Sequence, residues 1–142
     1  MFKTLSDTML ASPQITPDQV AEAASQGVTL IVNNRPEGES PDQPAGAAIE
    51  AAARDAGIGY VAIPVTHAGF SLPQVEMMKE ALSGNDGKTL AFCRSGTRST
   101  LLWALARTHE GEDPDAIEAA AAKAGYDVAP VRSIMDAFHA AA

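Results

Sequence analysis

Short apolar runs alternate with amphipathic segments along most of the chain. Runs rich in β-branched residues are typical of buried strands, and segments with an apolar residue every three or four positions are typical of helices. The pattern predicts strands at residues 5–10, 28–32, 60–65 and 89–92. It predicts helices at residues 16–27, 45–56, 71–84, 97–108, 113–124 and 133–139.

Capping residues support several of these helix starts. Thr16 precedes Pro17 and is followed at the third helical position by Gln19. Ser71 and Gln74 have the same spacing. A Ser or Thr cap with Gln at this distance satisfies the free N–H groups of the first turn, and Pro is favoured at the first helical position.

Alternating strands and helices predict an α/β fold, in which helices cover both faces of a mostly parallel sheet. A chain of 142 residues is expected to form one core, so we expect a single domain over residues 1–142. Ligands of such sheets bind beyond the carboxyl ends of the strands. Three loops leave those ends, at residues 33–44, 66–70 and 93–98.

The third loop carries the clearest chemical signal, because it begins with the only cysteine of the chain, Cys93. A strand that turns directly into a helix leaves main-chain N–H groups free at the positive end of the helix dipole. Such a site binds anions and stabilises a thiolate. We therefore expect Cys93 to be a nucleophile and Arg98 to hold an anion beside it.

Other residues of the three loops are candidates for substrate binding. The N–H groups of Ser95, Gly96 and Thr97 would form the cradle. Arg94 points either into the pocket or away from it, and Ser99 lies either on the helix surface or against the thiolate. His67 and Arg35 belong to the other two loops; Arg35 either reaches the pocket or pairs with Glu37 or Glu39, two charges expected to face solvent.

The composition narrows the possible partners. The net charge of −8 and the absence of a basic stripe argue against nucleic acid, and no apolar run is long enough for a membrane. One cysteine and no apparent secretory leader favour a cytoplasmic location. No spacing of histidines indicates a metal site, and nothing indicates a cofactor.

The spacing Cys93-(x)4-Arg98 resembles the rhodanese active-site loop, whereas Ile63-Pro64-Val65-Thr66-His67 resembles the acid loop of dual-specificity phosphatases. Taken whole, nearly the first three quarters of the chain resemble the bacterial beta-lactamase hydrolase-like protein phosphatase-like domains. The matching segments are 14–17, 32–39, 93–99 and 102–105. This resemblance implies the fold of dual-specificity and tyrosine phosphatases, and either phosphatase or sulfurtransferase activity.

Three departures from the phosphatase pattern favour sulfur transfer. Four residues separate Cys93 from Arg98 where phosphatases have five, so the ring of N–H donors is expected to fit a phosphoryl group less well. His67 occupies the position of the phosphatase Asp, and Phe92 replaces the His before the cysteine. Sulfur transfer needs no strong acid, because sulfite or a thiolate leaves as a stable anion.

The sequence therefore favours a rhodanese-like sulfurtransferase. Cys93 would take the sulfane sulfur of thiosulfate or a persulfide and pass it to a low-molecular-weight thiol. A persulfide dioxygenase partner is implied only by the resemblance. Two alternatives stay open: a phosphatase that forms a phosphocysteine from a phosphate ester, and a binder of anions or phospho-ligands without catalysis.

Overall fold

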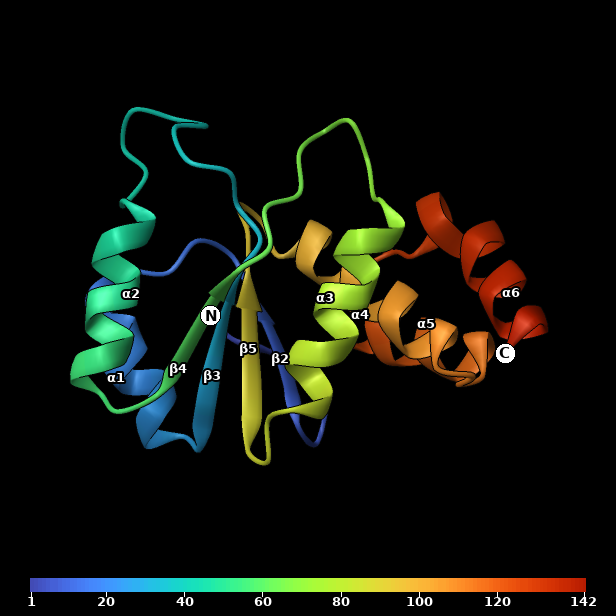
Figure 1. Cartoon of the computed structure of the whole chain (residues 1–142), viewed down its shortest axis with the longest axis horizontal. Coiled ribbons are helices and arrows are strands. Elements are labelled where there is room, and N and C mark those ends of the chain that lie inside the picture. Colours follow the sequence, from blue (N-terminus) through green and yellow to red (C-terminus); the bar gives the residue numbers. More distant parts are fainter.

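The computed structural model describes residues 1–142, in which helices cover both faces of a five-stranded sheet (Figure 1). The strands are β1 (Lys3–Ser6), β2 (Met9–Ser12), β3 (Val28–Asn33), β4 (Gly59–Ala62) and β5 (Lys88–Phe92). The helices are α1 (Pro17–Ser25), α2 (Gly46–Asp55), α3 (Leu72–Ser83), α4 (Thr97–His109), α5 (Pro114–Lys123) and α6 (Arg132–Ala141), with a 3-10 turn at Ala129–Val131. The predicted α/β class is confirmed.

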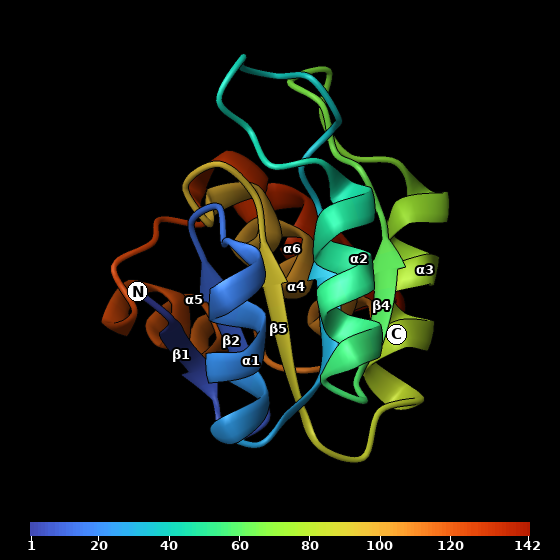
Figure 2. The same cartoon turned by 90° about the vertical axis from the view of Figure 1, so that its left-hand side faces the viewer.

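The strand order is β1-β2-β5-β3-β4, and only β1 runs antiparallel to its neighbour. β5 is therefore the central strand, paired on one side with β2 and on the other with β3. This placement puts the residues after β5 in the middle of the carboxyl edge. The segments that follow β3 and β4 rise above that same edge (Figures 1 and 2).

The predicted strand at residues 5–10 is wrong, because this stretch is a hairpin of two strands. β1 and β2 are joined at Asp7 and Thr8, and the Thr8 N–H donates to the Ser6 hydroxyl at 3.3 Å. The apolar residues on both arms, Leu5 and Met9 among them, face the core. Apolar spacing alone therefore did not reveal the intervening turn.

The strand predicted at residues 60–65 ends at Ala62. Ile63 and Val65 still donate N–H bonds to the carbonyls of Asn33 and Asn34, both at 2.9 Å. Pro64 has no N–H to donate, and regular pairing stops before it. The chain beyond β4 is nevertheless held against β3 as far as Val65.

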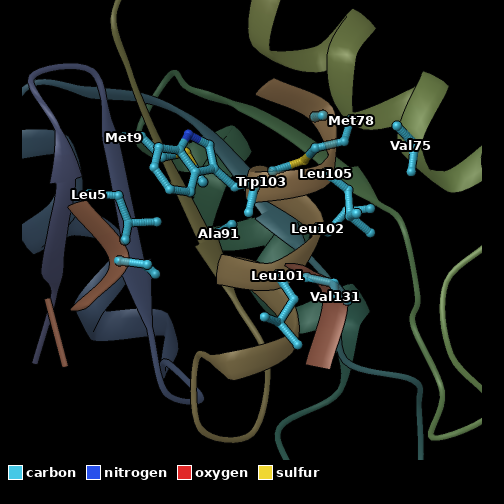
Figure 3. Close-up of a cluster of buried hydrophobic side chains, with 14 of the residues drawn as sticks. Leu5, Met9, Val75, Met78, Ala91, Leu101, Leu102, Trp103, Leu105 and Val131 are labelled. Atoms are coloured by element: carbon cyan, nitrogen blue, oxygen red, sulfur yellow. The ribbon is translucent and has the colours of Figure 1, made fainter. Parts of the chain in front are cut away.

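Two apolar clusters fill the spaces between the sheet and its helices. One lies under α1 and α2, and the larger one lies under α3 to α6. The larger cluster surrounds α4, where every residue from Leu101 to Ala106 is buried (Figure 3). A helix that is apolar on all sides is buried on all sides. Ser99 and Thr100, in the first turn of α4, are buried as well, so the core also holds the part of the helix next to Cys93.

None of the helices combines the length and the apolar character required to cross a bilayer.

Candidate active site

Cys93 lies at the end of the central strand, in a four-residue turn between β5 and α4. Its side chain is fully buried, and its Sγ accepts a hydrogen bond from the Gly96 N–H at 3.1 Å. The Cys93 N–H donates to the Ser12 carbonyl at 3.4 Å, which anchors the turn to β2. The strand, turn and helix predicted around the cysteine are all present.

Gly96 precedes α4 and has a left-handed conformation, with φ of 93°. Side chains other than that of glycine are disfavoured in this region. Space excludes a side chain as well, because a Cβ on Gly96 would lie 2.1 Å from the Tyr126 hydroxyl oxygen. The turn therefore requires glycine for two independent reasons.

Several main-chain N–H groups around the turn have no acceptor within the protein. These are the N–H groups of Arg94, Ser95, Arg98 and Ser99. The last two belong to the first turn of α4, where N–H groups point out of the helix and the dipole is positive. Thr97, predicted to share in the cradle, instead donates to the Ser95 hydroxyl at 3.3 Å. The unpartnered donors make this edge suited to an anion.

Arg98 is held by the loop that follows β3. Its two terminal nitrogens donate to the Glu39 carboxylate at 2.7 and 2.8 Å, and Nη1 also donates to the Val65 carbonyl at 2.7 Å. A guanidinium has five N–H groups. Two remain, on Nε and Nη2, and these form a parallel fork of the kind that binds two oxygens of one oxyanion.

The charge of Arg98 interacts with two groups, the Glu39 carboxylate and the cysteine sulfur. The Glu39 carboxylate is the main cause that raises the pKa of Arg98, and the negative charge of a Cys93 thiolate adds to the rise, while burial opposes it. Arg98 therefore connects Glu39 on one side with Cys93 on the other.

The Arg35 guanidinium is bonded within the protein and is not free to bind a substrate, which was one of its two predicted roles. It is 5% exposed and donates to Glu39 at 3.0 Å, to the Gln14 amide oxygen at 3.1 Å and to the Ser40 hydroxyl at 3.2 Å. The alternative interpretation, a pair with Glu39, describes the structure. The expectation that Glu39 faces solvent is wrong, because its carboxylate lies between two arginines with 16% of the side chain exposed.

The two arginines lower the pKa of Glu39 to about 2. The hydrogen bond from Arg98 is the largest cause; burial opposes it, and the hydrogen bond from Arg35 supports it. Because the folded value lies below the ordinary 4.5, the ionised pair stabilises the protein above that pH. The contribution is lost as pH falls toward 2.

Replacing Glu39 by Gln tests this coupling. The difference in unfolding free energy between wild type and Glu39→Gln should be largest near neutral pH and should shrink as the pH falls from 4.5 toward 2. Urea titrations at several pH values measure it. Glu50→Gln, at an exposed position of α2, serves as the control and should show no such trend. A constant difference across this window would contradict the assignment.

Ser99 fits neither of its two predicted roles. Its side chain is fully buried, and its hydroxyl donates to the Asn34 amide oxygen at 2.8 Å rather than to the thiolate. The Asn34 amide nitrogen donates in turn to the Ile63 carbonyl at 2.9 Å. Ser99 therefore joins the start of α4 to β3 and to the segment after β4.

Arg94 and His67 remain on the surface. The Arg94 side chain is exposed and makes no hydrogen bond, so it does not belong to the fixed contacts around Cys93. His67 lies in the exposed segment between β4 and α3, and its imidazole has no hydrogen-bond partner in the protein. The structure brings Cys93, Gly96 and Arg98 together and leaves these two apart from the fixed contacts.

Sequence reasoning did not predict the contact of Glu39 with Arg98, and it missed Tyr126 altogether. The Tyr126 hydroxyl donates to the Ser95 carbonyl at 3.1 Å, across 31 positions of sequence. Nothing in the sequence marks Tyr126, because it lies in a connection between two C-terminal helices. No group of three or more metal-binding side chains is present.

Residues 1–110 match the family described as "Beta-lactamase hydrolase-like protein, phosphatase-like domain". The chain belongs to this family. A family member, the beta-lactamase hydrolase-like protein of Xylella fastidiosa strain Temecula1, is 33% identical over 125 residues, which are 87% of this chain and 29% of that protein. The chain thus spans less than a third of the length of this curated relative.

The family fold is also seen in solved structures. A candidate phosphatase from Neisseria meningitidis is 32% identical, with a TM-score of 0.83 over 96% of both chains. PTPMT1 is 14% identical, with a TM-score of 0.75 over 99% of this chain and 95% of its own, which shows a shared fold only. The expected family and phosphatase-like fold are confirmed. The comparisons favour the phosphatase alternative over the sulfurtransferase that the sequence favoured.

Proposed function

We propose that this domain is a cysteine-dependent phosphatase acting on small phosphate monoesters. The observation that carries the proposal is the set of donors around Cys93: the unpartnered N–H groups at the start of α4 and the free fork of Arg98. A phosphoryl group brings three non-bridging oxygens to a nucleophile. Donors from the helix and from the arginine suit them together.

The proposed reaction has two steps. The Cys93 thiolate attacks phosphorus, the S–P bond forms, the P–O bond to the ester oxygen breaks, and that oxygen leaves with the bonding pair and takes up a proton. Water then attacks the phosphorus of the phosphocysteine, a new P–O bond forms, and the water gives up a proton to solvent. The S–P bond breaks with its electron pair on Cys93 Sγ, which releases inorganic phosphate and restores the thiolate. Arg98 and the loop N–H groups hold the phosphoryl oxygens in both steps.

The leaving group must be protonated, and this site lacks the carboxylic acid that does so in phosphatases. The segment that corresponds to the phosphatase acid loop presents His67 and no carboxylate. Imidazole can donate a proton near neutral pH, and we assign this role to His67 within the proposal. Esters whose alcohols leave as stable anions should need this donor least.

The rate should therefore depend steeply on the leaving group. We expect p-nitrophenyl phosphate to be hydrolysed about 100-fold or more faster than an alkyl phosphate. General acid catalysis contributes a factor of about this size, and this site has an imidazole in place of the phosphatase carboxylic acid. Steady-state release of inorganic phosphate measures both rates. His67→Ala should slow phenyl phosphate more than p-nitrophenyl phosphate. Equal rates for aryl and alkyl esters would contradict this expectation, because they would require a general acid as effective as the phosphatase carboxylic acid.

Sulfur transfer is the second candidate. The observation that favours it is the absence of a carboxylic acid from the segment that carries His67. Sulfite, unlike an alkoxide, leaves without a proton, so sulfur transfer does not need that acid. In this alternative a small thiol accepts the sulfur from a Cys93 persulfide. A parallel assay of p-nitrophenyl phosphate hydrolysis and thiosulfate-to-cyanide transfer separates the two. Turnover of thiosulfate alone, with an added sulfur on Cys93 by mass spectrometry, would replace the phosphatase proposal.

A further inference from the structure

Tyr126 lies outside residues 1–110, the part of the chain that matches the family. It lies three positions after the last residue of α5, Lys123, and its backbone is held by the end of that helix. Gly125 has a φ of 97°, its N–H donates to the Ala122 carbonyl at 3.0 Å, and the Tyr126 N–H donates to the Ala121 carbonyl at 2.9 Å. This pair of bonds is a Schellman motif. The backbone of Tyr126 is therefore well anchored.

The side chain of Tyr126 reaches the cysteine turn. Its hydroxyl donates to the Ser95 carbonyl oxygen at 3.1 Å. The next N–H along the chain, that of Gly96, donates to Cys93 Sγ at 3.1 Å. The Ser95 C=O and the Gly96 N–H belong to one peptide group. A single planar unit thus accepts from the tyrosine at one end and donates to the sulfur at the other.

We propose that Tyr126 is a positioning residue that acts on Cys93 through the Ser95–Gly96 peptide. By bonding the carbonyl, the phenol fixes the plane of this peptide with its N–H toward the sulfur. The bond also polarises the peptide, because hydrogen bonds in a chain strengthen one another. The polarised Gly96 N–H therefore stabilises a Cys93 thiolate more than it stabilises the thiol.

The electrostatics of the site agree with this geometry. Burial raises the pKa of Tyr126, and the negative charge of a Cys93 thiolate raises it further. The raised pKa favours the protonated phenol, which is the form that donates to the Ser95 carbonyl. Of the charged groups, Arg98 also acts on the sulfur, from the α4 side of the turn.

Removing the phenol oxygen tests the inference. In Tyr126→Phe, the pH midpoint of thiolate formation should rise by about half a unit, so that the thiolate fraction below the midpoint falls about threefold. The ultraviolet absorbance of the thiolate, titrated against pH, reports this midpoint, because Cys93 is the only cysteine. The same titration with Cys93→Ser in each background is subtracted, because tyrosinate absorbs in the same region. The inference rests on the thiolate of the proposed function, but this titration requires no turnover.

Tyr60→Phe is the matched control. Tyr60 is the other tyrosine of the chain; it packs in the apolar cluster on the opposite face of the sheet and accepts from the Asn33 amide at 3.0 Å. Loss of the Tyr60 hydroxyl should leave the pH midpoint of thiolate formation at the wild-type value. An unchanged midpoint in Tyr126→Phe, or an equal shift in both variants, would overturn the inference. Thermal melting of both variants checks that the fold is retained.

Discussion

Cys93→Ser should lose phosphatase activity by about 10⁴-fold or more, while binding of inorganic phosphate survives. The loss follows because a serine hydroxyl in this turn has no adjacent base to ionise it, and removal of a nucleophile costs most of the chemical rate. Binding should persist because the N–H groups of the turn and the Arg98 fork do not depend on sulfur. Phosphate release and isothermal calorimetry measure the two properties.

The same pair of measurements distinguishes catalysis from binding alone. A non-catalytic anion binder would show phosphate binding in wild type and in Cys93→Ser, with no turnover of a phosphate ester or of thiosulfate in either. Comparable hydrolysis by wild type and Cys93→Ser would contradict a covalent mechanism through Cys93.

Arg98→Lys should lower kcat/KM for p-nitrophenyl phosphate by about 10² to 10³-fold, although it conserves the charge. Lysine is a point charge without the planar fork, and it cannot hold Glu39 and two substrate oxygens together. Loss of one preorganised oxyanion donor typically has this effect on the rate. Steady-state kinetics with p-nitrophenyl phosphate give the value.

Arg107→Lys provides the control on the same helix. Arg107 lies in the last turns of α4 and pairs with Glu110 and Glu112, away from the cysteine turn. Its conservative replacement should leave kcat/KM near the wild-type value. Equal losses in the two variants would indicate a general effect on α4 rather than the loss of the Arg98 fork.

The cysteine turn could be predicted because its signals are local. A strand, a turn with glycine and a helix follow one another within a short stretch, so the sequence alone predicts the free N–H groups. Glu39 could not be found in this way. Its partner Arg98 is 59 positions away, and a glutamate in a polar loop gives the same pattern whether it faces solvent or an arginine.

The preference for sulfur over phosphate rested on three departures, and the first of them counted the residues between Cys93 and Arg98. That argument assumes that only the N–H groups of the residues between Cys93 and Arg98 bind the substrate, so that fewer residues leave less room. The structure shows that part of the donor set lies outside the counted residues, in the N–H groups of Arg98 and Ser99 at the start of α4. A shorter loop therefore changes which groups donate, and the number of residues alone does not decide the substrate.

Burial of a single cysteine also has consequences for oxidative damage. Cys93 is 0% exposed and has no second thiol in the chain with which to form a disulfide. Once hydrogen peroxide converts it to a sulfenic acid, no internal disulfide can prevent further oxidation. Reduction of the oxidised sulfur then requires a reductant small enough to reach the buried Cys93. The redox state of this domain therefore depends on the concentration of small thiols around it.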